Sequence, residues 1–239
     1  MEKHVRFNLI ILDESGSMSD CLRATIDGCN ETLDVVRNFQ KENADTIDSF
    51  VSIYAFHGWW EHGSRYIYKN VLASEVPDIT SEDYRPSGST PLLDSIGRTL
   101  TDLESVAKTH HLPSAVVTII TDGLENASRT YTYESVATII DRLKELGWTF
   151  NFIGANIDEI AESRKLHIDN HMSFRSDEGG TRHMFNRLRN ITNRDAIGLD
   201  KFIREEANMS EEEIIARRKE RARNYLSEDP GELTDDSPF

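Results

Sequence analysis

The sequence predicts an α/β fold in which helices cover both faces of a doubly wound, mostly parallel sheet. Two short apolar runs, residues 9–12 and 115–120, are rich in β-branched side chains and too short to cross a membrane. Such runs are typical of buried parallel strands. Each run leads into an aspartate, Asp13 or Asp122. Amphipathic segments alternate with further short strands almost throughout, and this alternation favours a parallel sheet.

The expected elements follow one another over about residues 5–193. We expect strands at 7–13, 48–56, 64–72, 115–121, 148–154 and 171–174. The strand at 64–72 follows a glycine-bounded turn at 57–63, so it should form an antiparallel hairpin at the sheet edge. The pattern therefore predicts about six strands, of which one edge strand is antiparallel.

Helices are expected at 19–41, 91–108, 133–146, 157–165 and 181–191. The first has a buried side that includes Leu33 and Val36 at helical spacing. Pro91 suits the first position of the second helix, and Gly147 ends the third. Residues 123–129 read as a polar loop.

Oxygen-bearing side chains gather where the strands end. Asp13-x-Ser15-x-Ser17 follows the first strand, and Thr90 lies in a Gly/Pro-marked loop that opens a helix. Carboxylates and hydroxyls are hard ligands, which Mg²⁺ accepts while it keeps some of its waters. A plain alternative is a strand-to-helix turn in which serine or aspartate caps the next helix. Because open α/β sheets bind ligands at the carboxyl ends of their strands, we expect one site formed by Asp13, Ser15, Ser17, Thr90 and Asp122.

These motifs, in this order, resemble the metal-ion-dependent adhesion site of the von Willebrand factor A (VWA) family, also called integrin I-like. The resemblance implies a Rossmann-like VWA fold with the first strand beside the strand that ends in Asp122. It also implies that Ser15, Ser17 and Thr90 bind Mg²⁺, Mn²⁺ or Ca²⁺ directly, whereas Asp13 and Asp122 act largely through water. The implied function is a non-enzymatic interaction module in which an Asp or Glu of a partner protein completes the metal shell.

Two other functions compete with this interpretation. A Mg²⁺-dependent phosphohydrolase would also place acids at strand ends, but it needs a base and a cation that holds phosphate. The three loops carry no lysine or arginine apart from Arg85 and Arg129 at their margins, and no Walker loop is present. A secreted adhesin would call for a signal peptide and disulfides. We therefore expect that the protein is not an enzyme.

The composition limits which classes of partner and which cellular compartment we expect for this protein. The net charge of −15 and the pI near 4.9 disfavour nucleic acid and anionic membranes, although solubility alone would explain them equally well. No apolar stretch reaches membrane-spanning length, and the first residues lack a signal-peptide core. Cys21 and Cys29 would lie about 12 Å apart on one helix, too far for a disulfide. We expect a cytoplasmic adaptor of the prokaryotic VWA type, with an ATPase-associated system as one expected partner.

The predicted division is a VWA domain at 1–195, a helical extension at 196–227 and a disordered acidic tail at 228–239. Within the extension, a capping box at Ser210 to Glu213 opens a helix, which is expected to pack lightly on the domain or on a partner. Trp59 and Trp60 in the turn could mark an interface, but covering the sheet edge is the favoured interpretation. His57 and His62 leave a transition-metal site as a weaker alternative.

Overall fold

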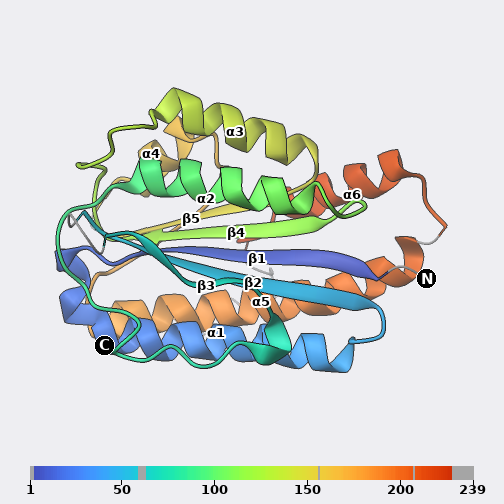
Figure 1. The fold of residues 1–239 in the computed structure, drawn as a ribbon, viewed down its shortest axis with the longest axis horizontal. Coiled ribbons are helices and arrows are strands. Elements are labelled where there is room, and N and C mark those ends of the chain that lie inside the picture. Colours follow the sequence, from blue (N-terminus) through green and yellow to red (C-terminus); the bar gives the residue numbers. More distant parts are fainter. Residues whose placement is uncertain (1–2, 59–62, 156, 207, 228–239) are drawn as a thin grey trace.

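The computed structural model describes residues 3–58, 63–155, 157–206 and 208–227. The Trp59–Trp60 turn, His62, Asn156 and the predicted tail at 228–239 lie outside these residues. Six strands form one sheet in the order β3-β2-β1-β4-β5-β6 (Figure 1). They are β1 (His4–Asp13), β2 (Ile47–Phe56), β3 (Arg65–Leu72), β4 (Ser114–Thr121), β5 (Thr149–Ala155) and β6 (Asn170–Phe174). Only the β2–β3 pairing is antiparallel, so the predicted fold class is confirmed.

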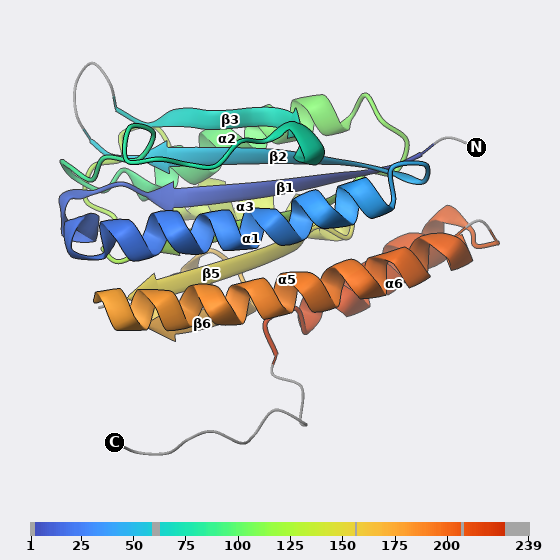
Figure 2. The same cartoon turned by 90° about the horizontal axis from the view of Figure 1, so that it is seen from below.

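Helices cover both faces of the sheet. The helices α1 (Leu22–Glu42) and α5 (Glu178–Glu206) lie on one face, and α2 (Leu92–Ala107), α3 (Tyr133–Glu145) and α4 (Glu159–Lys165) lie on the other (Figures 1 and 2). Side chains of β1 alternate between the two cores: Ile10 and Leu12 pack toward α1 and α5, and Leu9 and Ile11 toward α2 and α3. This two-sided burial explains why the strand reads as a continuous apolar run.

The sequence prediction was wrong about where two helices begin or end. The segment Gly16–Cys21 is a 3₁₀ helix, so α1 begins at Leu22 rather than at residue 19. The helix predicted to end at Ile191 continues to Glu206, because Leu199 and Phe202 extend its buried side onto a third apolar cluster. The predicted boundary after residue 195 therefore falls inside a continuous helix, and the domain division itself stays a prediction.

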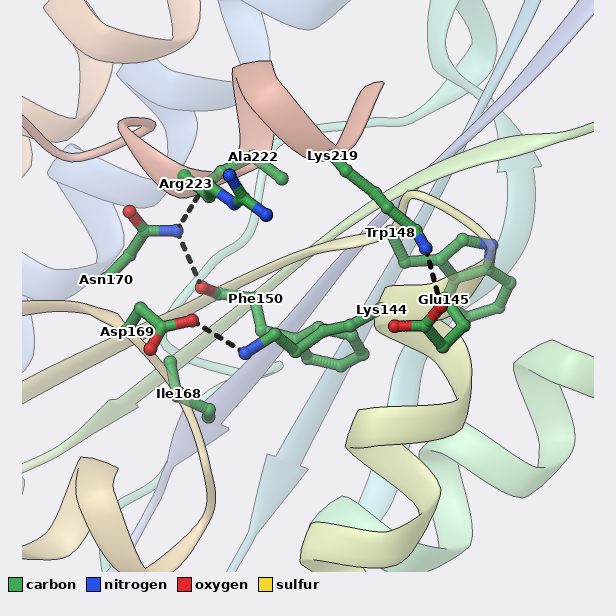
Figure 3. Close-up of a pocket in the computed structure, with 10 residues that line it drawn as sticks. All are labelled: Lys144, Glu145, Trp148, Phe150, Ile168, Asp169, Asn170, Lys219, Ala222 and Arg223. Atoms are coloured by element: carbon green, nitrogen blue, oxygen red, sulfur yellow. Dashed lines mark hydrogen bonds and ion pairs between the residues drawn. The ribbon is translucent and has the colours of Figure 1, made fainter. Parts of the chain in front are cut away.

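The extension helix α6 (Glu211–Arg223) packs on the domain. Its capping box is present, with Ser210 and Glu213 each binding the other's backbone N–H. Lys219 forms an ion pair of 2.6 Å with Glu145 at the end of α3. Asn170 of β6 donates to the carbonyl oxygens of Phe150 and Ala222, which joins the sheet to α6 (Figure 3). Figure 3 shows a small pocket of about 220 Å³ between the sheet and α6, and these contacts join residues that line it.

Buried ion pairs hold the end of α5 to the start of β1. Asp195 contacts Arg6 of β1 and lies 2.8 Å from Arg221 of α6. Burial alone would raise the pKa of Asp195, but the two arginines lower it below its usual value. Glu206 similarly pairs with His4 and with the buried Arg218. The first strand is therefore joined through charge to the two consecutive helices α5 and α6 near the other end of the sequence.

Both cysteines are buried free thiols, as expected, although Cys21 lies in the 3₁₀ segment. None of the helices that the structure describes is long and apolar enough to cross a membrane.

Candidate metal-binding site

The five predicted site residues meet at the carboxyl edge of the sheet. The strands β1 and β4 are parallel neighbours with Leu12 opposite Ile120, so Asp13 and Asp122 follow at adjacent strand ends. The chain moves from β1 to β2 on one side and places β4 on the other, which makes this the point where strand order reverses. The Thr90 loop joins them, because Gly16 N–H donates to Gly88 O at 3.1 Å. Ligands of open α/β sheets bind at such a point.

Hydrogen bonds connect the site side chains. Asp13 Oδ1 accepts the N–H of Ser15 at 2.7 Å, and the hydroxyls of Ser15 and Ser17 lie 3.1 Å apart. Ser17 then donates to Asp122 Oδ1 at 2.6 Å. Thr90 lies beside these hydrogen-bonded side chains. The hydroxyl oxygen of Thr90 is 3.3 Å from the position that a Cβ atom on Gly123 would occupy. The structure therefore brings all five residues together.

The site is buried apart from one side. Asp13, Ser15, Thr90 and Asp122 are all less than 5% exposed, whereas Ser17 is exposed. Burial raises the pKa of Asp13 to about 6, although hydrogen bonds from Thr121 and Ser15 oppose the shift. A raised pKa means that the negative charge of this carboxylate is poorly compensated in the protein alone. A cation would supply the missing compensation, so the donor set fits a hard divalent ion that solvent reaches from the Ser17 side.

No group of three or more His, Cys, Asp or Glu side chains suited to a metal occurs among the described residues. The serine and threonine hydroxyls are therefore required for any metal shell here. His57 lies 3.6 Å from Glu14 rather than in a metal cluster, and the His57–His62 alternative stays a prediction because His62 is not described.

Glu14 supports the candidate site, and the sequence analysis missed it. It is fully buried between Asp13 and Ser15, and its carboxylate forms two bonds with Arg65 and accepts the N–H of Arg85. Its carbonyl oxygen accepts the N–H of Ser87 at 2.8 Å. These contacts attach the end of β1 to the segment that leads into Thr90. Glu14 occupies the variable position between Asp13 and Ser15, and nothing in the neighbouring sequence indicates this role.

The loop after β4 is held just as firmly. The carboxylate of Glu125 accepts N–H groups of Leu93, Ala127 and Ser128, and Asp94 accepts those of residues 129–131. Asn126 Oδ1 accepts the N–H of Thr90 at 2.8 Å. The segment predicted as a polar loop therefore fixes Thr90 relative to Asp122.

Ser176 is a second residue that the sequence analysis missed. It lies between β6 and α5, and its hydroxyl donates to Asp122 Oδ2 at 2.8 Å. Both oxygens of Asp122 thus accept a serine hydroxyl, one from Ser17 and one from Ser176. The second bond orients the carboxylate, as outer contacts commonly do around metal ligands.

Replacing Ser176 with alanine should therefore weaken Mn²⁺ binding about five- to tenfold, since it removes one orienting hydrogen bond. Isothermal titration calorimetry measures the change. The matched control is Ser173→Ala on the exposed side of β6, which should leave the affinity unchanged. Equal affinities for the parent and Ser176→Ala would show that the contact does not orient Asp122.

Comparison with known proteins places the fold. No protein-family model matches the chain, and no curated protein matches it. A solved von Willebrand factor type A protein from Catenulispora acidiphila aligns at 20% identity over 80% of this chain and 42% of that chain, with a TM-score of 0.50. The pilus adhesin SpaC from Lactobacillus rhamnosus GG aligns at 12% identity over 81% of this chain and 30% of that chain, with a TM-score of 0.57.

The match spans less than half of either of those proteins, and at these identities it concerns the fold alone. Together with the strand order and the helices on both faces, it identifies the chain as having the von Willebrand factor A fold.

Proposed function

We propose that this domain is a divalent-metal-dependent module that captures an Asp or Glu carboxylate of a partner protein. The observation that carries the proposal is the convergence of three hydroxyls and two carboxylates at one sheet edge, with an exposed side at Ser17. The structural similarity to a solved von Willebrand factor type A protein supports such a role.

Charge and coordination support a carboxylate as the ligand that the partner protein supplies to the metal ion. Ser15, Ser17 and Thr90 would hold Mg²⁺, or Mn²⁺ or Ca²⁺, through neutral oxygens, while Asp13 and Asp122 would act largely through water. Neutral ligands leave much of the ion's charge uncancelled, and Mg²⁺ usually retains positions for water or another oxygen. A carboxylate fills such a position better than a neutral group, because it brings charge as well as a lone pair.

We also propose that the domain is not an enzyme. Arg65, a positive charge that contacts the motif, is engaged by Glu14 through two hydrogen bonds rather than directed at a substrate. The alternative is a Mg²⁺-dependent phosphohydrolase, and hydrolysis of p-nitrophenyl phosphate with Mg²⁺ or Mn²⁺ tests it. Turnover that disappears in Asp13→Asn would favour the enzyme.

The setting that we propose is a cytoplasmic adaptor of the prokaryotic VWA type, with an ATPase-associated system as a candidate partner. Free, buried thiols agree with a reducing compartment, where disulfides are rare. The net charge of −15 disfavours nucleic acid and anionic membranes.

Thr90→Ala should lose the partner while the fold remains, because the change removes one metal ligand and one methyl-sized group. The test is affinity capture from lysate of the source cells in Mg²⁺, followed by mass spectrometry. The matched control is Thr130→Ala, an exposed threonine in the neighbouring loop. We expect proteins that the parent and the control retain but that Thr90→Ala and EDTA-treated protein do not.

In the captured partner, replacing the Asp or Glu that contacts the metal with Asn or Gln should abolish its binding to the parent protein. Recovery of the same proteins in all four samples would contradict metal-bridged capture.

A further inference from the structure

A groove of about 600 Å³ lies at the amino end of the sheet, opposite the metal-binding site. It is lined by residues at the start of β1, around the end of α1, just before β4, near the end of α5 and around the start of α6. The ten residues of β1 separate it from Asp13 by about 30 Å. Its volume falls in the range of about 300–1,000 Å³ that is common for pockets that bind ligands. A molecule in this groove would therefore not touch the metal-binding site.

The groove has an apolar floor. Four side chains form it: Leu112, Ile203, Met209 and Ile214. They pack on the cluster that contains Phe39 and Phe202, so the floor is continuous with a core. Leu112 has φ of 41°, which is a costly backbone conformation for a leucine. Arg218 holds it there by donating to the Leu112 carbonyl oxygen at 2.8 Å. The structure thus maintains an unfavourable backbone at a position that lines the groove.

The rim of the groove is acidic. Five carboxylates border it against two cations, Lys3 and Arg204. Lys3 already pairs with Asp48 at 3.0 Å, and Arg204 pairs with Asp200 on its own helix. Glu42 and Asp45 are exposed and form no ion pair with any residue that the structure describes. The groove thus has carboxylates that remain available to a cationic ligand, and it should repel an acidic ligand.

We propose that this groove binds a segment of a partner protein in which apolar side chains are flanked by lysine or arginine. The apolar side chains cover the floor, and the cations pair with Glu42 and Asp45 at the rim. This chemistry is the opposite of that of the candidate metal-binding site, for which we propose a carboxylate. The two ends of the domain therefore select different partner sequences, and the groove does not depend on the metal.

A labelled hexapeptide with two central leucines between paired lysines tests the proposal by fluorescence anisotropy at physiological salt. Two matched peptides serve as controls, one with central serines and one with glutamates in place of the lysines. We expect the leucine–lysine peptide to bind at least about tenfold more tightly than either control, since it alone satisfies floor and rim. EDTA should leave its binding unchanged, which separates this result from the outcome for the metal-binding site.

Variants locate the binding. Ile203→Asp in the floor should weaken binding at least about tenfold, whereas Ile197→Asp on the same helix, at a position 67% exposed outside the groove, should not. Asp45→Lys should weaken binding about threefold or more, against a control of equal charge change, Glu134→Lys on α3. Asp45 and Glu134 are both exposed, so we expect both variants to fold.

Three results would overturn the proposal. Equal binding of the serine peptide would show mere charge attraction. Equal losses in Asp45→Lys and Glu134→Lys would place the peptide elsewhere. A parent dimer in light scattering that Ile203→Asp abolishes would show that a second copy of this chain, not a basic partner segment, covers the groove.

Discussion

Asp13→Asn is expected to abolish divalent-cation binding and, at the same time, to stabilise the metal-free protein. Asp13 is fully buried beside Asp122, and burial raises its pKa from 3.8 to about 6. A raised pKa means that the ionised form is disfavoured in the folded state, so at pH 7 the charge costs stability. The shift corresponds to about 3 kcal/mol, which a neutral amide would largely recover.

The amide preserves the local hydrogen bonds. Its oxygen can accept the N–H of Ser15, and its nitrogen can donate to Thr121, whose hydroxyl can then donate to the Gly123 carbonyl at 3.0 Å. Thermal unfolding in EDTA should show a rise of several degrees, and calorimetry should show no Mn²⁺ binding. The control Asp20→Asn, an exposed acid in the 3₁₀ segment, should change neither quantity. A variant that is less stable in EDTA and still binds Mn²⁺ would contradict this account of Asp13.

Asp195→Ala is expected to destabilise the protein by about 3–5 kcal/mol, since it leaves the buried Arg6 without its carboxylate. The same change removes the ion pair of Arg221 on α6, which keeps only its bonds to the carbonyl oxygens of Gly198 and Asp195, so the contact between α5 and α6 should weaken as well. Urea unfolding, followed by circular dichroism, measures the loss.

The matched control for this prediction is Asp200→Ala, which removes a pair on the same helix between the exposed Arg204 and the partly exposed Asp200. Exposed pairs of this kind contribute about 0–1 kcal/mol, so this variant should stay close to the parent. Similar losses in both variants would show that helix propensity rather than the buried charges explains the effect.

The two aspartate-ended strands were predictable because their signal is local. Each is a run of apolar residues buried on both faces, and the parallel arrangement brings Asp13 and Asp122 to one edge. Ser15, Ser17 and Thr90 followed from an ordered motif that lies in turns next to these strands. The structure places all five residues as the pattern indicates, while the metal itself stays a prediction.

The contacts that support the site were not predictable, because each joins residues distant in sequence. Arg65 donates hydrogen bonds to the buried carboxylate of Glu14, and Ser176 donates one to the carboxylate of Asp122. The length of α5 was missed for a similar reason: Asp195 reads as a surface residue until Arg6, 189 positions away, provides its partner. Sequence periodicity reports which side of a helix is buried, but not which buried charges find partners.

The central claim is that the five oxygen side chains form one divalent-cation site that accepts a carboxylate. Mn²⁺ titration by calorimetry on the parent, Thr90→Ala and Thr130→Ala tests it most directly, with a second titration of acetate into the Mn²⁺-loaded protein. We predict one Mn²⁺ per chain in the parent and in Thr130→Ala, binding weakened at least about tenfold in Thr90→Ala, and acetate binding only with the metal present. No Mn²⁺ binding by the parent, or equal affinity in all three proteins, would contradict the claim.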